Sequence, residues 1–192
     1  MKTILRPALV LFVLLTLLCC VVYPLAVTGI GRVAFPDQAD GSIVMKDGKA
    51  VGSSLIGQAF SSPQYFWGRP SATSPMSDNA ESSSGSNFGP TNPAQIDAVK
   101  QRIAALKAAD PTNAMPVPVD LVTASASGLD PEISPAAAYY QASRVAAARK
   151  VNIEAVRGMI SQFTQGQILG FLGEERVNVL ALNMALDQAT AK

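Results

Sequence analysis

Residues 8–27 read ALVLFVLLTLLCCVVYPLAV, twenty positions without a charge, of which seven are Leu, five are Val and one is Phe. An α-helix rises about 1.5 Å per residue, so this stretch would reach about 30 Å, the thickness of the hydrocarbon core of a bilayer. Each large apolar side chain favours insertion by about 0.3–0.6 kcal/mol at the centre of such a helix. The run from Ala8 to Val27 therefore predicts one transmembrane helix ending near residue 30, followed by one more polar domain.

The charges that flank this run predict its orientation. Two basic side chains, Lys2 and Arg6, and the terminal amine precede the run, whereas Arg32 is the only base close behind it and two aspartates follow. Positive charge is retained in the cytoplasm. We therefore expect residues 1–7 to form a cytoplasmic tail and residues 31–192 to form an extracytoplasmic domain of a single-pass protein.

Two other interpretations of the apolar run fit less well. A cleaved signal peptide has an apolar core of about 7–15 residues and an A-x-A-like site, but this core is longer and residues 22–27 offer no such pair of small residues. A lipoprotein site would need a small residue before its cysteine, and Leu18 precedes Cys19. Cys19 and Cys20 are more simply small apolar residues of a lipid-embedded helix.

The composition excludes several classes of function. Residues 31–192 suffice for one domain with a core, but they contain no Cys, and the whole chain contains no His. A disulfide, a thiolate metal site, and Ser-His-Asp or Cys-His catalysis are therefore excluded from this domain. A net charge of +1 without a basic cluster argues against nucleic-acid binding. We expect no catalytic residues, no metal site and no enzyme activity of the chain by itself.

The first part of the domain predicts extended structure and then a loop. Residues 42–67 read as extended, and Asp47-Gly48 between residues 43–46 and 49–53 is a strong hairpin signal. Residues 74–93, SPMSDNAESSSGSNFGPTNP, are rich in Ser, Asn, Gly and Pro and predict a long polar loop. Loops of this length inside a compact domain usually bind a partner or move.

The second part predicts four helices, over residues 93–109, 135–150, 152–163 and 179–188. The first three begin with a capping residue: Asn92 before Pro93, Ser134 before Pro135, and Asn152. The helical spacing of the apolar residues assigns the inward faces, which comprise Ile96, Val99, Ile103 and Leu106 opposite Lys100, Arg102 and Lys107 in the first helix, and Ile153, Val156, Ile160 and Phe163 in the third.

One further strand is expected. Residues 117–126, VPVDLVTASA, place β-branched residues at alternate positions, which is typical of a strand. Strands and helices in separate runs within one domain indicate an α+β fold. We therefore expect one transmembrane helix followed by a single α+β domain with a small sheet and about four helices.

Residues 65–71, YFWGRPS, are the first candidate for partner contact. Tyr65, Phe66, Trp67 and Arg69 are residue types that dominate binding hot spots, and the Trp is the only one in the chain. Equally, the rings could form core while Arg69 binds loop carbonyls through its fixed fork of donors. Ser71 completes the segment, and both interpretations stay open.

Residues 123–131, TASASGLDP, are the second candidate. Small hydroxyl residues beside Gly and Asp allow close backbone approach and satisfy loop groups, so Ser125, Ser127 and Asp130 are expected to build turns or contact a partner. A catalytic serine would need a base, and none is identifiable. Gly52 and Gly57 have the spacing of a phosphate loop but lack the Lys and Ser/Thr that should follow, which favours turn glycines.

These segments together carry a resemblance to a known family. The chain resembles the C subunit of the Kdp potassium-transporting P-type ATPase. The resemblance rests on residues 6–8 (RPA), 23–25 (YPL), 52–60, 65–73 (YFWGRPSAT), 85–87 (GSN) and 119–149, which begin VDLVTASASGLDPEISP. The similarity extends over essentially the whole chain in the same order. One departure is Glu132, where many relatives carry His.

The resemblance implies a single-pass subunit of an inner-membrane complex that takes up potassium with energy from ATP. Its implied partners are a channel-like potassium-binding subunit, an ATP-hydrolysing subunit and a small single-span peptide. ATP and potassium would be handled by the complex rather than by a cofactor site here. The family is also described as a catalytic chaperone that raises the ATP affinity of the hydrolysing subunit through a transient ternary complex with ATP.

That description conflicts with the charge pattern, because ATP is cytoplasmic and the domain is expected outside. We therefore expect any effect on ATP affinity to be indirect, through contacts that differ between two states of the partners. Direct action on ATP is the alternative hypothesis and requires the opposite topology. A tethered extracytoplasmic enzyme or solute-binding domain is a third, which the missing His and Cys disfavour.

Overall fold

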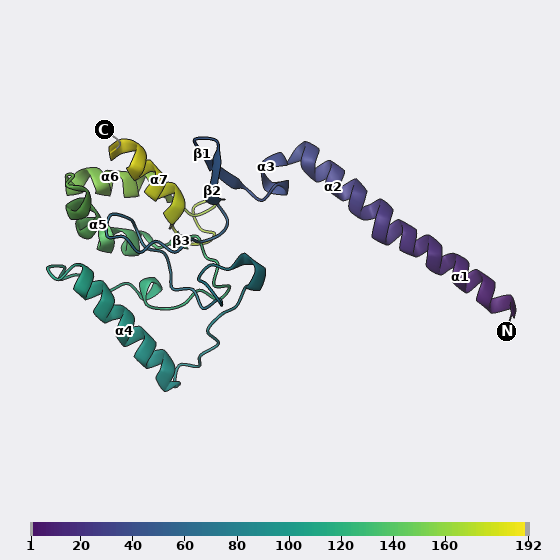
Figure 1. Cartoon of the computed structure of the whole chain (residues 1–192), viewed down its shortest axis with the longest axis horizontal. Coiled ribbons are helices and arrows are strands. Elements are labelled where there is room, and N and C mark those ends of the chain that lie inside the picture. Colours follow the sequence, from purple (N-terminus) through teal and green to yellow (C-terminus); the bar gives the residue numbers. More distant parts are fainter. Residues whose placement is uncertain (1, 191–192) are drawn as a thin grey trace. The chain divides into compact units, whose positions relative to one another are not determined.

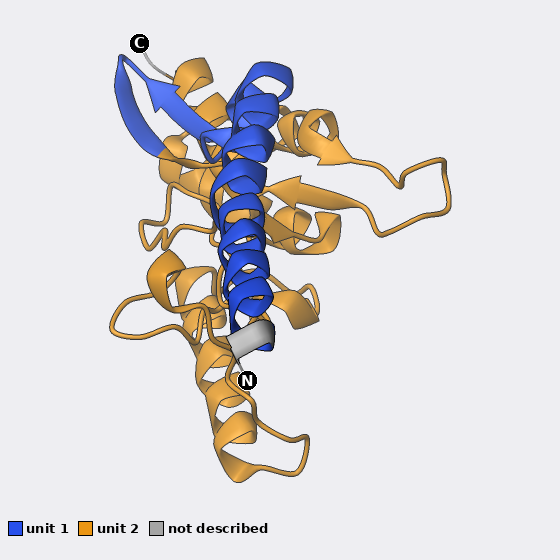
Figure 2. Ribbon diagram, turned by 90° about the vertical axis from the view of Figure 1, so that its right-hand side faces the viewer, with its two compact units in different colours: residues 1–51 blue, residues 52–192 orange. Residues whose placement is uncertain are grey.

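A computed structural model describes residues 2–190, which form two compact units that divide between Val51 and Gly52 (Figure 2). The two terminal residues 191 and 192 of the expected domain, and residue 1 of the expected tail, lie outside the described residues. The membrane boundaries expected from the sequence, near residues 7 and 31, stay a prediction.

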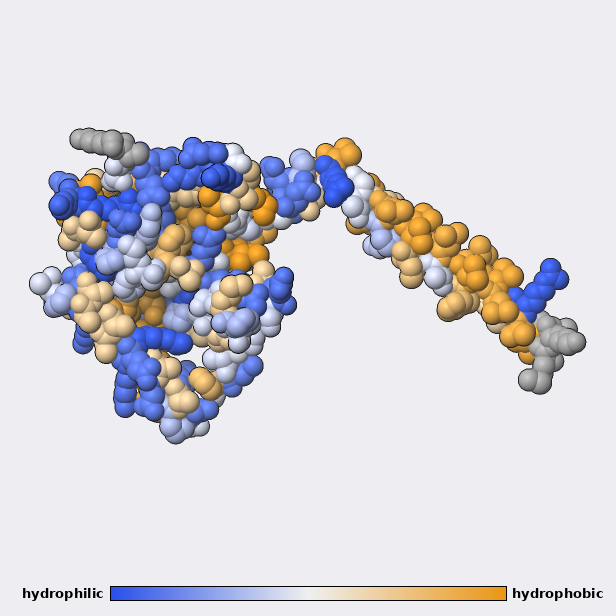
Figure 3. Space-filling view, viewed as in Figure 1, coloured by the Kyte–Doolittle hydropathy of each residue, from blue (hydrophilic) through white to orange (hydrophobic). Residues whose placement is uncertain are grey.

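The first unit contains the expected apolar helix. Helix α1 (Lys2–Leu17), a π-helical turn η1 (Leu18–Val22) and helix α2 (Tyr23–Ala34) follow one another without a break (Figure 1). Of these residues, Ile4–Ala34 form a 31-residue apolar segment long enough to cross a membrane, and none of its most apolar window is buried within the protein. Figure 3 shows that most of the surface of this helix is apolar, with scattered polar positions. The predicted apolar helix is confirmed, and it is longer at both ends than Ala8 to Val27.

A short helix α3 (Pro36–Ala39) leads to the predicted hairpin. Strand β1 (Ile43–Lys46) pairs with strand β2 (Lys49–Ser53), and the turn consists of Asp47 and Gly48 at φ angles of 51° and 74°. Two consecutive positive φ angles define the type I′ geometry whose twist matches that of paired strands. The expectation of a hairpin is confirmed, although residues beyond β2 are irregular rather than extended.

The second unit is an α+β arrangement built mainly after residue 92. Its elements are η2 (Ala80–Ser82), α4 (Pro93–Ala109), η3 (Val119–Leu121), β3 (Glu132–Ile133), α5 (Pro135–Arg149), α6 (Ile153–Phe163), β4 (Thr164–Gln165), β5 (Arg176–Asn178) and α7 (Val179–Thr190). The three short strands form an antiparallel sheet in the order β3-β5-β4. The fold class expected from the sequence is confirmed.

Three of the four predicted helices begin where the capping residues place them. The side chains of Asn92, Ser134 and Asn152 accept hydrogen bonds from backbone N–H groups of the first turns of α4, α5 and α6, at 2.8–3.0 Å. Lys150 ends α5 in the left-handed conformation at a φ of 56°. Such caps satisfy backbone groups that a helix leaves unpaired at its ends, which is why these limits are predictable.

The core lies where α5, α6 and α7 pack on one another and on β5. Helix α5 contributes small residues, so the neighbouring backbones approach closely, while Val156, Ile160, Leu182 and Leu186 of α6 and α7 fill the space between them. The inward face predicted for α6 is confirmed, because Val156 and Ile160 are buried and Ile153 and Phe163 pack against the core.

The strand expected at residues 117–126 is wrong. Val119–Leu121 instead form one 3₁₀ turn, and the hydroxyl of Thr123 donates to the carbonyl of Val119 at 2.8 Å. Pro116 and Pro118 lack the N–H that a sheet ladder needs, and the Thr side chain offers the backbone a competing local bond. Leu121 and Val122 are both buried, so burial does not alternate as it would in a strand.

The inward face predicted for α4 is partly wrong. Leu106 is buried, and Val99 and Ile103 pack against the core, but Ile96 is 46% exposed. Arg102, expected on the solvent side, donates from Nη1 to the carbonyl of Val122 at 2.9 Å. Helical spacing alone does not define how far a helix extends past its core, and the long stem of an arginine can reach back to a loop.

Candidate functional site

Phe66 anchors the aromatic segment in the core of the second unit. Its side chain is completely buried. Its N–H donates to Oδ1 of Asn183 at 2.8 Å, and its carbonyl accepts from Nδ2 of the same side chain at 3.0 Å. The buried amide on α7 thus satisfies both backbone groups, as a neighbouring strand would. Of the two interpretations left open for Phe66, the structure agrees with the core one, because the core encloses its ring and leaves no exposed surface for a partner.

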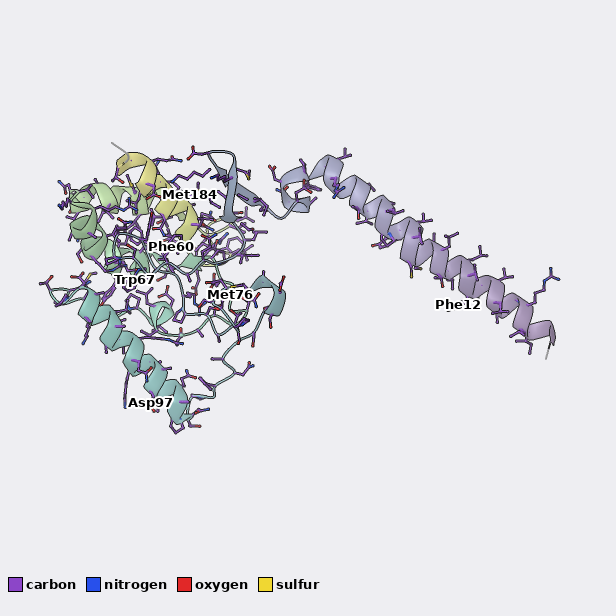
Figure 4. All side chains as sticks on the ribbon, viewed as in Figure 1. Phe12, Phe60, Trp67, Met76, Asp97 and Met184 are labelled. Atoms are coloured by element: carbon purple, nitrogen blue, oxygen red, sulfur yellow. The ribbon has the colours of Figure 1, made fainter. Side chains whose placement is uncertain are left out.

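Trp67 is held in the same way by helix α5. Its N–H donates to Oε1 of Gln141 at 2.8 Å, and Nε2 of Gln141 donates back to its carbonyl at 3.1 Å. The guanidinium of Arg144 lies over its ring, 3.8 Å from the centroid, and the indole N–H donates to the carbonyl of Ser62. Figure 4 shows Trp67 and Phe60 within the second unit. The indole is therefore fixed on both its edge and its face.

Arg144 connects this segment to α5 through two further hydrogen bonds, and a third bond joins it to Gln141 within α5. Nη1 donates to the carbonyls of Pro63 and Tyr65 at 2.6 and 3.1 Å, and Nη2 donates to Oε1 of Gln141 at 2.6 Å. Burial lowers the pKa of Arg144 to about 10, and nearby Asp110 opposes that shift. The guanidinium is thus still charged at neutral pH, and its hydrogen bonds are charge-assisted.

Tyr65 lies at the outer end of the segment, next to α7. Its hydroxyl donates to Oδ2 of Asp187 at 3.3 Å, and its ring packs against Phe60 at a centroid distance of 5.3 Å. Arg149 lies over the ring at 5.0 Å and pairs with Asp187 at 2.9 Å. Tyr65 is half-buried, so part of its ring remains available to another molecule.

Arg69 joins the aromatic segment to the second candidate segment. Its Nη1 pairs with Oδ2 of Asp130 at 2.9 Å, and its Nη2 donates to the carbonyl of Ala124 at 3.4 Å. The other carboxylate oxygen of Asp130 accepts from the N–H of Glu132. Both ends of the ion pair are about one quarter exposed. The Nε of Arg69 is buried and has no hydrogen-bond partner among the described residues.

The serines of both segments complete this junction. Ser71 donates to the carbonyl of Gly128 at 2.7 Å, and the N–H of Ser125 donates to the carbonyl of Pro70 at 3.1 Å. Ser127 accepts at its carbonyl from Ser83 and Ser84 of the polar loop. The structure therefore brings together Arg69, Ser71, Ser125, Ser127 and Asp130, which the sequence separates by more than fifty positions. Ser125 is buried, whereas Ser127 is exposed.

Gly52 and Gly57 occupy tight positions, but neither faces a phosphate-sized space. A Cβ at Gly57 would lie 2.6 Å from Oδ1 of Asp78 and 2.7 Å from the carbonyl of Asp130. The N–H of Gly57 already donates to the carbonyl of Leu129 at 2.9 Å. Burial raises the pKa of the Asp78 carboxyl. A surrounding of acceptor oxygens does not attract phosphate, so packing explains these glycines.

Three residues of this site escaped the sequence analysis: Gln141, Arg144 and Asn183. Each is a buried polar side chain on a helix whose other buried residues are mainly Ala, Val and Leu. Polar residues at such positions are rarely buried without a partner. A polar residue on an otherwise apolar helix face is therefore the signal by which these three residues could be found in the sequence. It does not identify what the side chain binds. Among residues 2–190, no group of three or more acidic or Cys side chains could hold a metal ion.

The chain thus combines an apolar helix able to cross a membrane with an α+β unit whose charged and aromatic side chains fix loops. Together these features define a single-span, membrane-anchored α+β protein. The chain belongs to the KdpC family, described as K+-transporting ATPase, c chain, which matches residues 5–188.

Full-length relatives agree with this assignment. A potassium-transporting ATPase KdpC subunit of Herminiimonas arsenicoxydans is 70% identical over 188 residues, covering 98% of this chain and 99% of the relative. Those of Janthinobacterium sp. (strain Marseille) and Dechloromonas aromatica are 68% and 66% identical, covering 98% and 99% of this chain and all of each relative. The resemblance expected from the sequence is confirmed.

Proposed function

We propose that this chain is a non-catalytic accessory subunit of an ATP-driven potassium-uptake complex, where it supports assembly and the function of the other subunits. The observation that carries the proposal is the family match from residue 5 to residue 188, which includes both the apolar helix and the second unit. The partners would be a channel-like potassium-binding subunit, an ATP-hydrolysing subunit and a small single-span peptide.

The anchor would contribute to assembly inside the membrane. No residue of the most apolar part of Ile4–Ala34 is buried within the protein, so the whole circumference is available to lipid and to partner helices. Between apolar helices in lipid, close van der Waals packing drives association because hydrophobic transfer gains nothing. Gly29 and Gly31, which have open space where a Cβ would stand, would allow close approach near one end.

The second unit would lie outside the cytoplasm. Near the C-terminal end of the helix, Arg32 has Asp40 at 4.0 Å and Asp37 nearby in sequence, so its positive charge is offset. Arg6, near the N-terminal end, has no acidic neighbour in sequence. Uncompensated positive charge favours the cytoplasmic side. The N-terminus would then be cytoplasmic and the membrane would be the plasma (inner) membrane.

Any effect on ATP would be indirect in this arrangement. The glycine-rich segment around Gly57 is closed by Asp78 and the carbonyl of Asp130, which oppose phosphate binding. A photo-crosslinkable ATP analogue applied to the intact complex should therefore leave residues 32–192 unlabelled. Labelling of that region would favour the direct chaperone role instead.

The decisive experiment is a topology measurement. A reporter active only outside the cytoplasm, fused after Lys192, is expected to be active, while a cytoplasm-active reporter at the same position is expected to be silent. Both fusions should be made in a chain that restores growth on low potassium, so that function is retained. The reverse pattern would overturn the extracytoplasmic placement and make direct contact with ATP the leading explanation.

Arg69 provides a test of the proposed partner surface. Arg69→Ala removes the ion pair to Asp130 and releases the junction with the 123–131 segment, so complex yield or potassium-stimulated ATPase activity is expected to fall several-fold. Arg157→Ala is the matched control, because it removes a 2.8 Å ion pair to Glu154 that is exposed on α6. Exposed pairs contribute about 0–1 kcal/mol, so this variant should behave as wild type. Unchanged yield, activity and potassium affinity in Arg69→Ala would count against the proposed surface.

A further inference from the structure

The loop between β4 and β5 exposes a group of large apolar side chains. Residues 166–175 read GQILGFLGEE, and Ile168, Leu169, Phe171 and Leu172 are 60, 80, 70 and 48% exposed. Figure 2 shows the loop extending from its two short strands away from the helices of the second unit. We call Ile168–Leu172 the apolar tip. Scattered apolar residues are ordinary on a surface, but a contiguous group of four in five positions marks an interaction site.

Hydrogen bonds hold the apolar tip in one conformation. Ile168 and Leu172 form a bridge in which each N–H donates to the other carbonyl, at 2.9 and 3.0 Å. Leu169 and Gly170 adopt positive φ angles of 55° and 79°, which closes a tight turn between them. A positive φ is unfavourable for a bulky residue such as Leu. The bridge nevertheless holds the turn in one conformation with its side chains facing outward, so a partner would not need to order it on binding.

An acidic groove lies at the base of this loop. It has a volume of about 260 Å³ and is lined by five carboxylates and two guanidinium groups, a formal net charge of −3: Asp120, Asp130, Glu132, Glu174, Glu175, Arg69 and Arg176. Two ion pairs, Arg69–Asp130 and Arg176–Glu132, neutralise part of this charge. Glu174 and Glu175 are exposed and form no ion pair or hydrogen bond with any other described residue. The apolar tip is thus followed, after Gly173, by two negative charges without an ion pair.

The sign of this charge selects the kind of partner. Segments that insert into a membrane surface carry Lys, Arg, Trp or Tyr beside their apolar residues. Residues 164–175 contain none of them, and the adjacent Arg176 is paired with Glu132. Two glutamates would also be repelled by anionic lipids. A protein surface that combines an apolar hollow with basic side chains at its rim matches both features, since apolar centres and polar rims are the usual anatomy of protein interfaces.

We propose that the apolar tip inserts into an apolar hollow of a partner subunit while Glu174 and Glu175 pair with basic side chains at the rim of that hollow. The proposal rests on the proposed function, since it requires that the chain be part of a complex. It assigns the main contact to a loop that lies outside both segments predicted from the sequence. Arg69 and Asp130 then line the same groove as the two glutamates, so the junction described above would support the contact surface.

The test uses the whole complex in detergent, with an affinity tag on a partner subunit. In Leu169→Asn/Phe171→Ser the apolar contact is lost, and Asn suits the positive φ at position 169. We expect this chain to dissociate at least about tenfold faster, the size of a hot-spot effect. A second variant, Glu174→Lys/Glu175→Lys, should also dissociate faster, with the effect diminishing as NaCl is raised from 50 mM to 500 mM. The matched control is Val119→Ser, which removes another highly exposed apolar side chain, 71% exposed.

The outcomes separate this proposal from the broader one. If the unmodified chain fails to co-purify with any partner, the proposed function itself fails. If it co-purifies and both loop variants dissociate at the same rate as Val119→Ser, only the docking proposal is overturned. It is also overturned if the variants instead abolish self-association of the isolated chain in detergent. An unchanged unfolding midpoint, followed by Trp67 fluorescence, shows that the variants are folded.

Discussion

Replacing Phe66 with alanine is expected to lower the free energy of unfolding of the second unit by about 3–5 kcal/mol. The ring is completely buried, and its backbone is bonded in both directions to the equally buried Asn183. Truncation leaves a cavity between the loop and α7, which cannot close without breaking the two bonds to the amide. The measurement is urea unfolding of the full chain in detergent, followed by the fluorescence of Trp67, the only Trp in the chain.

Phe88→Ala is the matched control for this prediction. Phe88 is 43% exposed, so its removal is expected to cost less than about 1 kcal/mol. If Phe66→Ala unfolded at the wild-type midpoint while complex yield fell, Phe66 would act as a partner contact, as one of the two interpretations of the sequence holds, and its buried position would be wrong.

The second large effect is expected at Arg144. Arg144→Met should lower the free energy of unfolding by about 3 kcal/mol, because the carbonyls of Pro63 and Tyr65 lose their donor inside the unit. The stacking on Trp67 at 3.8 Å is lost as well, and it is worth up to about 2 kcal/mol where desolvated. Relief of a buried charge offsets part of the loss, which is why the expected effect is smaller than the sum.

A lysine at position 144 separates the contribution of the positive charge to stability from the contribution of the planar guanidinium. Arg144→Lys retains the charge but cannot donate along the three directions of the guanidinium or stack flat on the indole, so an intermediate loss of stability is expected. The Trp67 emission spectrum should change in both variants, since the group that covers the ring is altered. Arg157→Met, at the exposed pair with Glu154, should change stability by less than about 0.5 kcal/mol. Equal stability of Arg144→Met and wild type would contradict the assigned network.

Local signals explain which elements could be predicted. Asn92, Ser134 and Asn152 cap their helices through side-chain bonds that span two or three residues, so the sequence contains the whole interaction. The hairpin at Asp47-Gly48 is equally local. The strand expected at residues 117–126 does not form, because Pro116 and Pro118 lack the N–H groups that a sheet ladder needs even though the β-branched residues around them favour a strand.

The candidate site was only partly predictable for the same reason. The sequence identified both segments, residues 65–71 and 123–131, from their composition. Their junction depends on the pairing of Arg69 with Asp130, 61 positions apart, and no local pattern encodes such a distance. The apolar tip was overlooked because a run such as ILGFL reads equally as core, and only burial distinguishes the two.

The sequence by itself determined the membrane anchor, the class of fold, the starts of the capped helices α4, α5 and α6, and the family. These properties depend on hydropathy over about twenty positions, on caps within one helical turn and on the order of short motifs. Only the tertiary structure decided that Phe66 is core, that Gln141 and Asn183 hold the aromatic segment, and that Ile168–Leu172 face solvent. Each of these depends on which distant side chains fill the surrounding space, and packing of that kind arises only when the chain has folded.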